Sequence, residues 1–230
     1  MDYSPPIDHY PDRPENRSRI PPGQHQVTGF PVLSINSEPY FDGSNWNLTV
    51  DGLVENPVTW TWQELLELKK TTLKADFHCV TGWTRLDLEW AGVSFKTICD
   101  IVKPKSTAQY VTSYGPEDYT SSLPFQLYMD DTDVLVAYEL NNKPLDSEHG
   151  GPLRLLVPKI YAYKSTKWLQ KLTFTEQWER GFWERIGYHQ RADPWLDERY
   201  SNQEEKAIKR KRLELEKEFR KKERELHKSD

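Results

Sequence analysis

The sequence has no apolar stretch long enough to cross a membrane. Its longest run without Asp, Glu, Lys or Arg extends from Ile20 to Ser37, and polar residues and prolines interrupt that run throughout. A membrane-spanning helix needs about 20 consecutive, mostly apolar residues. The sequence therefore predicts a protein without a transmembrane span.

Cysteine is also scarce. Cys79 and Cys99 are the two cysteines among 230 residues, and no CxxC motif or Cys/His pair has the spacing of a zinc site. Two cysteines allow one disulfide, but they do not make the disulfide framework of a small secreted protein. The N-terminal residues lack the apolar core of a secretion signal. We therefore expect a cytoplasmic location.

Positive charge is lacking in the main body of the chain. Residues 1–200 carry 20 Lys and Arg against 28 Asp and Glu, whereas residues 201–230 carry 11 against 8. Proteins that bind nucleic acids need basic side chains to neutralise phosphates. The acidic body therefore argues against a DNA or RNA partner.

The length and composition predict one domain with an appendage at each end. Six of the first 24 residues are proline, so residues 1–24 are expected to form an extended or disordered arm. Residues 201–230 are rich in helix formers and predict a charged C-terminal helix, which either is solvated or packs its narrow apolar stripe on this domain or another chain. Residues 25–200 remain as the single folded domain.

Short strands and short helices follow one another in this domain. Thr61 and Glu64 form a capping-box pattern that predicts a helix over 62–69, and Ser94 predicts the start of a helix that ends near Val102. The pair Asn141-Asn142 predicts a hairpin turn. Strands are expected over 46–54, 72–79, 109–113, 134–140, 153–158 and 169–175. Because there is no regular βαβ alternation and no GxGxxG motif, the pattern favours an α+β fold with a mixed or barrel-like sheet over a Rossmann fold.

Cys79 stands at the end of an expected strand, beside His78. A cysteine at such a position is usually a small buried apolar residue, and the alternatives are a nucleophile or a metal ligand. Neighbouring residues of a strand point to opposite faces, so His78 is poorly placed to act as a base for Cys79. The pattern therefore argues against a thiol-dependent hydrolase.

A second cluster combines three cations with a hydroxyl and an imidazole within 19 residues. Its members are His149, Arg154, Lys164, Ser165 and Lys167. Arg binds phosphate through a planar fork and Lys as a point charge, so the cluster is able to hold a phosphate. Alternatively, the cations pair with carboxylates on the surface of an acidic domain.

Three motifs follow one another along the chain, FHCVTGWTRLDLEWAGV at 77–93, HGGPLRLLVP at 149–158 and KSTKWL at 164–169. With these motifs the sequence resembles the molybdopterin-binding domain of the sulfite oxidase family, and the resemblance extends over about residues 21–200. It implies that family's α+β fold, with mixed sheet and barrel elements and short helices, here followed by a C-terminal helix. It also implies an oxidoreductase that moves an oxo group to or from a small substrate.

The resemblance also implies roles for individual residues. Cys79 matches the cysteine whose thiolate binds the metal, and a soft sulfur donor suits such a metal. His149 and Arg154 match the pair that grips the pterin and its phosphate, while Ser165 and Lys167 match the loop that closes on the same group. The further cofactor contacts that the resemblance implies are Phe77, His78, Ser113, Tyr114, Lys164 and the Gly29-Phe30 segment.

The cofactor implied is molybdenum-molybdopterin without an appended nucleotide, with tungsten as an alternative metal. The chain has no haem segment and ends before the family's immunoglobulin-like dimerisation domain. We therefore expect a monomer that exchanges electrons with a separate partner. Trp183 and Trp195 mark either a docking face for that partner or aromatic side chains packed beneath the terminal segment.

The residues after Cys79 depart from the family pattern. The first cation after this cysteine is Arg85, whereas animal sulfite oxidases have an Arg-rich stretch there. The C-V-x-x-W pattern is similar to that of the periplasmic molybdenum methionine-sulfoxide reductase, which suggests a sulfoxide or N-oxide as substrate. The hypothesis from another class is a non-catalytic scaffold that keeps the pterin fold and binds a partner through its C-terminal helix.

Overall fold

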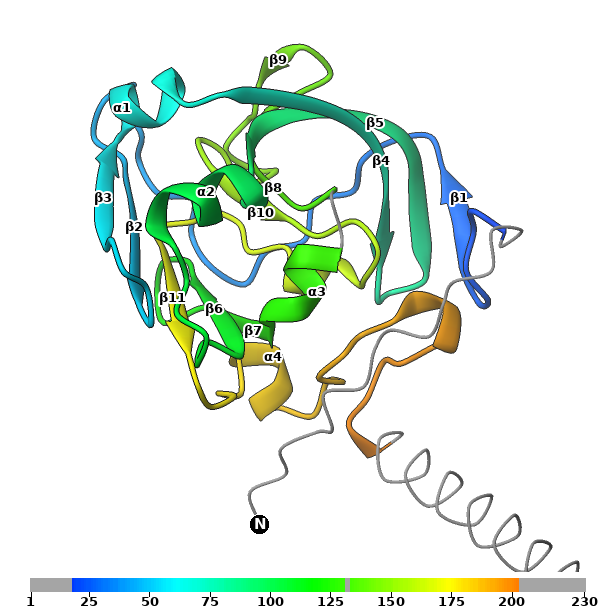
Figure 1. Ribbon diagram of the computed structural model, residues 1–230. Helices are drawn as coiled ribbons and strands as arrows, with labels where there is room; N and C mark the ends of the chain where they lie inside the picture. The colour runs from blue at the N-terminus through cyan, green and yellow to red at the C-terminus, as the bar shows by residue number, and fades with distance from the viewer. Residues whose placement is uncertain (1–17, 131–132, 203–230) are drawn as a thin grey trace, which may run out of the picture.

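Two β-sheets form the framework of the protein (Figure 1). The computed structural model describes residues 18–130 and 133–202. Sheet A contains β1 (His25–Val27), β4 (Lys70–Cys79), β5 (Trp83–Ser94), β8 (Leu135–Leu140), β9 (Lys143–Pro144) and β10 (Arg154–Leu156). Sheet B contains β2 (Asn47–Gly52), β3 (Val58–Thr61), β6 (Tyr110–Tyr114), β7 (Thr120–Pro124) and β11 (Lys171–Thr175). Both sheets are mixed, because β1 pairs with β5 and β2 with β11 in parallel while the other pairs are antiparallel.

Short helices connect the strands. They are α1 (Trp62–Glu67), α2 (Phe95–Val102), α3 (Phe125–Asp130), α4 (Phe182–Arg185) and the 3-10 turns η1 (Ala162–Lys164) and η2 (Pro194–Leu196). In Figure 1, α2 and α3 lie in front, near the centre of the molecule. The mixed sheets with short helices confirm the predicted α+β fold.

Local sequence signals set the ends of two helices. The Thr61 hydroxyl accepts from the Glu64 backbone N–H, and the Glu64 carboxylate accepts from the Thr61 N–H, which is the predicted capping box. The Ser94 hydroxyl caps α2, and Lys103 ends it in a left-handed conformation with φ 51°. Helix α1 is two residues shorter than expected, whereas α2 ends at the expected residue.

A long curved hairpin carries Cys79. Strands β4 and β5 run antiparallel across the upper part of Figure 1, and they are joined by a tight turn between Cys79 and Trp83. Gly82 has φ 106° in this turn and donates its N–H to the Cys79 carbonyl at 3.0 Å. The turn therefore holds Cys79 at the end of its strand.

Two apolar clusters form the core. The larger one joins sheet B with α2 and α3, and the smaller one lies under the β4–β5 hairpin. Phe77, Cys79, Trp83 and Trp90 belong to the smaller cluster. Burying one large apolar side chain stabilises a fold by about 1.5–3 kcal/mol. The strand end that carries Cys79 is therefore fixed by packing as well as by its turn.

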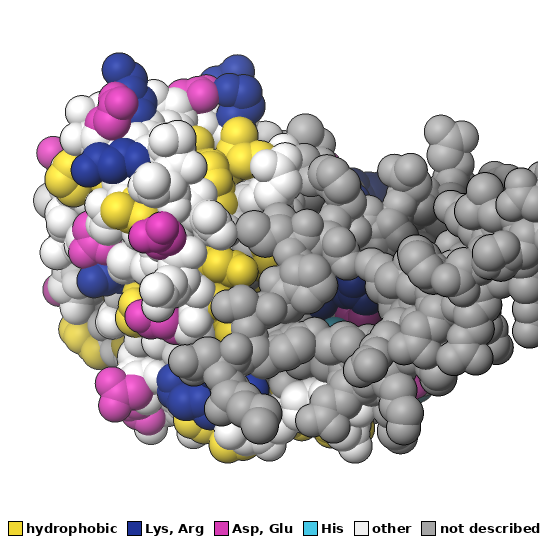
Figure 2. Space-filling model, turned by 60° about the horizontal axis from the view of Figure 1, so that its bottom comes forward, with side chains coloured by type: hydrophobic (Ala, Val, Ile, Leu, Met, Phe, Trp, Pro, Cys, Tyr) yellow, Lys and Arg dark blue, Asp and Glu magenta, His cyan; other side chains and the backbone are white. Residues whose placement is uncertain are grey.

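Most of the two predicted terminal segments lies outside the described residues. These parts are residues 203–230 of the predicted C-terminal helix and residues 1–17 of the predicted arm. Among the described helices, none is both long and apolar enough to span a bilayer. On the face shown in Figure 2, the coloured side chains of Lys, Arg, Asp and Glu are interspersed.

Candidate active site

A cavity of about 290 Å³ opens where the end of β4 meets the loops of sheet A. Its lining comes from five parts of the chain: 30–36 after β1, 77–83 at the β4–β5 turn, 116–119 between β6 and β7, 149–168 around β10 and η1, and 183–188. Residues far apart in the sequence therefore meet at one site.

Cys79 contributes its thiol to this cavity. Its Sγ lies 3.1 Å from the Thr81 hydroxyl, and burial raises the pKa of the thiol. The Cys79 carbonyl accepts from the side-chain amide of Gln24 at 2.9 Å. Cys99 lies in the core on α2, and both cysteines are free thiols. Cys79 thus presents sulfur to the cavity from a fixed backbone.

Arg154 is a buried guanidinium at the same cavity. It is 2% exposed, donates to the carbonyls of His149 at 2.6 Å and Ser165 at 3.0 Å, and lies 4.9 Å above the Phe77 ring. Its Nε has no hydrogen-bond partner, and in the described part of the chain no carboxylate forms a salt bridge with it. Burial lowers its pKa to about 10. A buried cation without a counterion is a site prepared for an anion.

His149 and Lys167 flank Arg154. The His149 ring stacks on Phe30 with centroids 4.3 Å apart, and its Nε2 lies 2.9 Å from the Phe30 carbonyl oxygen. Lys167 Nζ donates to the Glu148 carbonyl at 2.5 Å, and burial together with the Arg154 charge lowers its pKa to about 8. Two neighbouring cations therefore face the same part of the cavity.

A glycine lets the two loops of this site approach each other. Gly150 has φ 106°, and a Cβ there would lie 3.0–3.1 Å from atoms of Lys167. The Ser165 hydroxyl accepts from the Val157 N–H at 2.9 Å, which fixes the loop next to β10. The cavity thus gathers Phe77, Cys79, His149, Arg154, Ser165 and Lys167 from the residues predicted to hold a cofactor.

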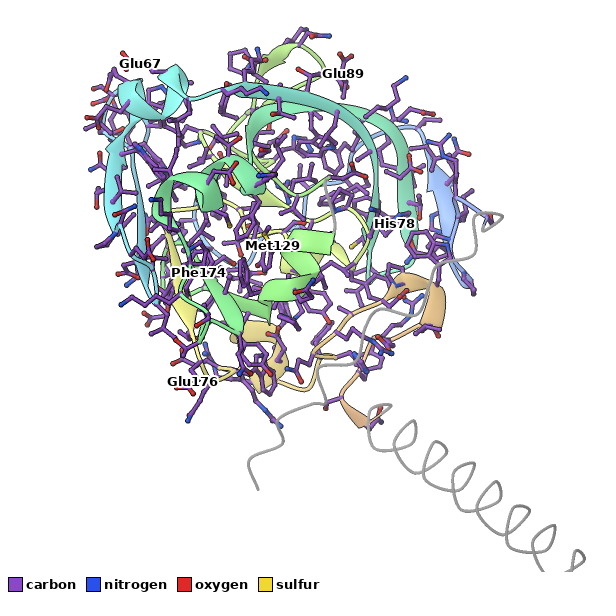
Figure 3. The ribbon with its side chains drawn as sticks, in the orientation of Figure 1. Glu67, His78, Glu89, Met129, Phe174 and Glu176 are labelled. Carbon is purple, nitrogen blue, oxygen red and sulfur yellow. The ribbon has the colours of Figure 1, made fainter. Side chains whose placement is uncertain are left out.

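Four other residues that were predicted to contact the cofactor lie outside the cavity lining. Their contacts with a cofactor stay predictions. His78 points away from Cys79 toward Thr84 and Trp195, with Nδ1 3.0 Å from the Thr84 hydroxyl; Figure 3 labels it at the lower end of β4. The Ser113 hydroxyl donates to the Ser121 carbonyl inside sheet B. The Tyr114 ring lies 5.2 Å from Lys171 Nζ, and the fourth residue, Lys164, forms an ion pair with Glu184.

Other lining residues are not among the predicted cofactor contacts. They include Leu33, Ile35, Tyr119, Tyr163, Trp183 and Tyr188. Trp183 lines the cavity, whereas the Trp195 indole donates to the Ser18 carbonyl at 2.9 Å. The segment 30–36 has no regular secondary structure and is positioned by single contacts, such as the Asn36 side chain donating to the Pro116 carbonyl at 2.7 Å.

Comparison with known proteins agrees with this geometry. Residues 35–183, more than half of the chain, match the family described as the oxidoreductase molybdopterin binding domain. The chain belongs to this family. It is 42% identical over 188 residues to the uncharacterized oxidoreductase YuiH of Bacillus subtilis, a match that covers 81% of this chain and 94% of that protein.

Two further similar proteins are longer than the region that this chain matches. The catalytic subunit MsrP of a protein-methionine-sulfoxide reductase from Campylobacter jejuni is 26% identical over 190 residues, covering 73% of this chain and 64% of that protein. The sulfane dehydrogenase SoxCD of Paracoccus pantotrophus has a similar fold, with a TM-score of 0.57 at 23% identity, covering 69% of this chain and 46% of that one. This molybdopterin-binding domain thus spans less than two thirds of either protein.

The residues present fit a pterin cofactor that carries a phosphate and a metal. Cys79 offers a soft sulfur donor, and Arg154 offers a buried cation whose Nε has no partner among the described residues. Gly150 leaves room for the Lys167 loop to lie directly beside them. Cys79, Arg154 and Lys167 all line one cavity, as a single bound group requires.

Proposed function

We propose that the protein is a molybdenum-pterin oxidoreductase that transfers an oxo group to or from a small substrate. In this proposal Cys79 is the thiolate ligand of the metal. The observation that supports it is that the Cys79 thiol and the buried, counterion-free Arg154 line one cavity in a chain of the molybdopterin-binding family.

Each residue has a distinct task in this proposal. When bound, the cofactor supplies a metal that exchanges two electrons and an oxo group with the substrate. Cys79 holds the metal, and Arg154 and Lys167 hold the phosphate by charge-assisted hydrogen bonds. The stacked rings of Phe30 and His149 form an aromatic part of the cavity lining.

We further propose that the cofactor is the plain molybdopterin form without a nucleotide, with tungsten as the alternative metal. Electrons would come from or go to a separate partner, because the proposed site holds a single redox centre; the name of MsrP as a catalytic subunit supports this. A cytoplasmic location agrees with the two free cysteines. The monomeric state stays a prediction.

The experiment measures the cofactor directly. The protein and its Cys79→Ser and Cys99→Ala variants are purified from a host that makes molybdopterin, and molybdenum, tungsten and released pterin are quantified. We expect about one metal and one pterin per chain in the parent and in Cys99→Ala, because Cys99 lies in the core away from the cavity. Cys79→Ser should lose most of its metal.

A parent protein with neither metal nor pterin would contradict the proposal. The non-catalytic scaffold would then be the better explanation, because a scaffold needs neither metal nor pterin. Equal metal content in Cys79→Ser and in the parent would refute only the role of Cys79 as the metal ligand.

A further inference from the structure

Two residues outside the region that matches the family hold the turn after Cys79. The match covers residues 35–183, whereas Gln24 comes before it and Arg199 after it. The Gln24 amide donates to the Cys79 carbonyl at 2.9 Å, and the Arg199 guanidinium donates through Nη1 to the Val80 carbonyl. Each of the two side chains thus binds a main-chain carbonyl at the start of the turn.

These contacts fix two successive peptide units. The Cys79 carbonyl belongs to the peptide that joins Cys79 to Val80, and it also accepts from the Gly82 N–H at 3.0 Å. The Val80 carbonyl belongs to the next peptide, which joins Val80 to Thr81. Because a peptide unit is planar and rigid, a bond to its carbonyl also fixes the start of the residue that follows. Arg199 therefore sets the backbone position from which the Thr81 side chain extends.

The Thr81 hydroxyl lies against the sulfur of Cys79. Its Oγ1 is 3.1 Å from Cys79 Sγ, and both residues line the cavity. A hydroxyl can donate a hydrogen bond and a thiolate can only accept one, so Thr81 is the donor when Cys79 is a metal-bound thiolate. Hydrogen bonds to a sulfur ligand tune the electronic properties of the metal and its reduction potential. The direction of the Thr81 hydroxyl therefore bears on the proposed ligand.

Arg199 is itself held in one orientation. Its Nε donates to the Asp197 carboxylate at 2.6 Å, and the Tyr161 hydroxyl donates to the same carboxylate oxygen at 3.3 Å. The guanidinium carbon lies 5.6 Å from the centre of the Tyr161 ring. Tyr161 is fully buried and forms a β-bridge with His78, on the strand that carries Cys79. The groups that orient Arg199 are therefore anchored next to the turn that it holds.

The chain around Gln24 also contacts the turn and Arg199. The His25 N–H, which follows Gln24 directly, donates to the Gly82 carbonyl at 3.0 Å. A Cβ at Gly23 would lie 3.4 Å from Arg199 Nη2, so the main chain of Gly23 passes close to the guanidinium. Residues 23–25 and Arg199 thus meet at the turn, although they stand at opposite ends of the described chain.

We propose that Gln24 and Arg199 are positioning residues for the Cys79 ligand. They fix the two peptides that follow Cys79, and Arg199 thereby directs the Thr81 hydroxyl at its sulfur. The inference rests on the proposed function, in which Cys79 binds the metal. It goes beyond that function because it gives two residues outside the matched region a task at the metal ligand.

The first test measures the turn in the cofactor-free protein. Hydrogen exchange of the Gly82 amide, followed by NMR, reports how firmly its bond to the Cys79 carbonyl is held. We expect Arg199→Met and Gln24→Met each to speed this exchange about 10-fold, while the amides of α2 in the core keep their rates. Arg199→Lys keeps a cationic donor and should restore most of the protection. Arg185→Met, at an exposed site on α4, should leave the Gly82 rate unchanged.

The second test measures the midpoint potential of the metal in the loaded protein, by redox titration followed by electron paramagnetic resonance. Thr81→Val removes the hydrogen bond to the sulfur and should lower the potential, whereas Thr81→Ser keeps the hydroxyl and should stay close to the parent. Arg199→Met should shift the potential in the same direction, and Arg199→Lys should restore it. If Arg199 acts through Thr81, then Arg199→Met should cause little further shift in a protein that already carries Thr81→Val.

The outcomes separate this inference from the proposed function. A parent protein without metal and pterin refutes the proposed function, while exchange at Gly82 still decides whether Gln24 and Arg199 hold the turn. Unchanged exchange at Gly82 in both Met variants overturns the inference alone. Equal acceleration of the α2 amides also overturns it, because the two residues would then only stabilise the whole fold. Additive shifts of the potential in Thr81→Val and Arg199→Met would refute the action of Arg199 through Thr81.

Discussion

The Lys164 ammonium and the Glu184 carboxylate form an ion pair in the interior, with side chains 0% and 2% exposed. Lys164 closes η1 directly before Ser165, and Glu184 lies on α4. The Lys164 ammonium also donates to the Ser122 carbonyl at 3.3 Å. The pair therefore ties the loop that carries Ser165 and Lys167 to the helix that carries Trp183.

Replacing one partner of this pair should strongly destabilise the protein. Lys164→Met leaves the Glu184 carboxylate buried without its cation, and a broken buried pair costs about 3–5 kcal/mol. Urea unfolding of the parent and variant measures the change in the free energy of unfolding. Lys96→Ala removes an exposed pair with Asp100 and should cost less than about 0.5 kcal/mol. Similar losses in both variants would show that the buried pair contributes little.

The Arg154→Met variant should lose its pterin while the stability of the cofactor-free protein changes little. In residues 18–130 and 133–202 no carboxylate pairs with the buried guanidinium, so its removal relieves an unpaired charge while it also removes two hydrogen bonds to carbonyls. We expect the cofactor-free protein to change by no more than about 1 kcal/mol in urea unfolding. Pterin content should fall below about a tenth of the parent value. Arg180→Met, at an exposed site, should keep its pterin. Full pterin content in Arg154→Met would refute the phosphate-binding role.

Elements with strong local signals could be predicted from the sequence. Helix α2 has a Ser94 cap at its start and a left-handed Lys103 before Pro104 at its end. The β8–β9 hairpin has Asn141 and Asn142 with φ 50° and 62°, which asparagine tolerates better than most residues. Such signals depend on a few adjacent residues, so they can be recognised without knowledge of the rest of the fold.

The sequence alone does not predict the elements that depend on tertiary contacts. Strand β5 does not alternate between apolar and polar residues, because its C-terminal half is buried on both faces, and a positive φ at Asp87 interrupts its pattern. Strand β7, with the sequence TSSLP, has few apolar residues and forms by pairing with β6. Helix α3 follows it directly and was missed with it.

Some residues of the candidate site can likewise be predicted from the sequence, and others cannot. Cys79, His149 and Arg154 lie in motifs whose residue types indicate their chemistry, and the structure brings them to one cavity. Tyr188 belongs to no such motif, and its place beside Trp183 in the cavity lining follows from how the chain folds back after α4. Lys164 is the opposite case. Its position next to Ser165 in the sequence predicts a contact with the cofactor, whereas in the structure its ammonium forms an ion pair with Glu184.

Lys167 should make anion binding depend on pH. Burial and the charge of Arg154 lower its pKa to about 8, while the carboxylates of Glu38, Asp146 and Glu148 oppose that shift. In the cofactor-free protein its charge is present below about pH 8 and is lost above it. Affinity for inorganic phosphate, measured by calorimetry from pH 7.5 to 10, should therefore fall as the pH rises through this range. Lys167→Arg keeps its charge there and should show a flatter profile. Parallel profiles would assign the loss to another group.

A buried hydrogen-bond chain behind Cys79 should contribute measurably to stability. The Thr84 hydroxyl donates to the Gln24 side-chain oxygen at 2.8 Å, so it accepts from His78 Nδ1 at 3.0 Å. The Gln24 amide in turn donates to the Cys79 carbonyl at 2.9 Å. Thr84 is fully buried and His78 is 2% exposed. The chain thus connects the imidazole to the backbone that presents the thiol.

Thr84→Val keeps the shape of the side chain and removes its hydroxyl. His78 Nδ1 and the Gln24 oxygen would both lose this partner, and an unsatisfied buried polar group costs about 1–3 kcal/mol. We expect the free energy of unfolding to fall by about 2 kcal/mol in urea titrations. Thr59→Val, whose hydroxyl lies 3.0 Å from that of Thr49 on the exposed face of sheet B, should change it by less than about 0.5 kcal/mol. If both variants were equally stable, the chain behind Cys79 would not be needed to hold this strand end, and packing of Phe77 and Trp83 would suffice.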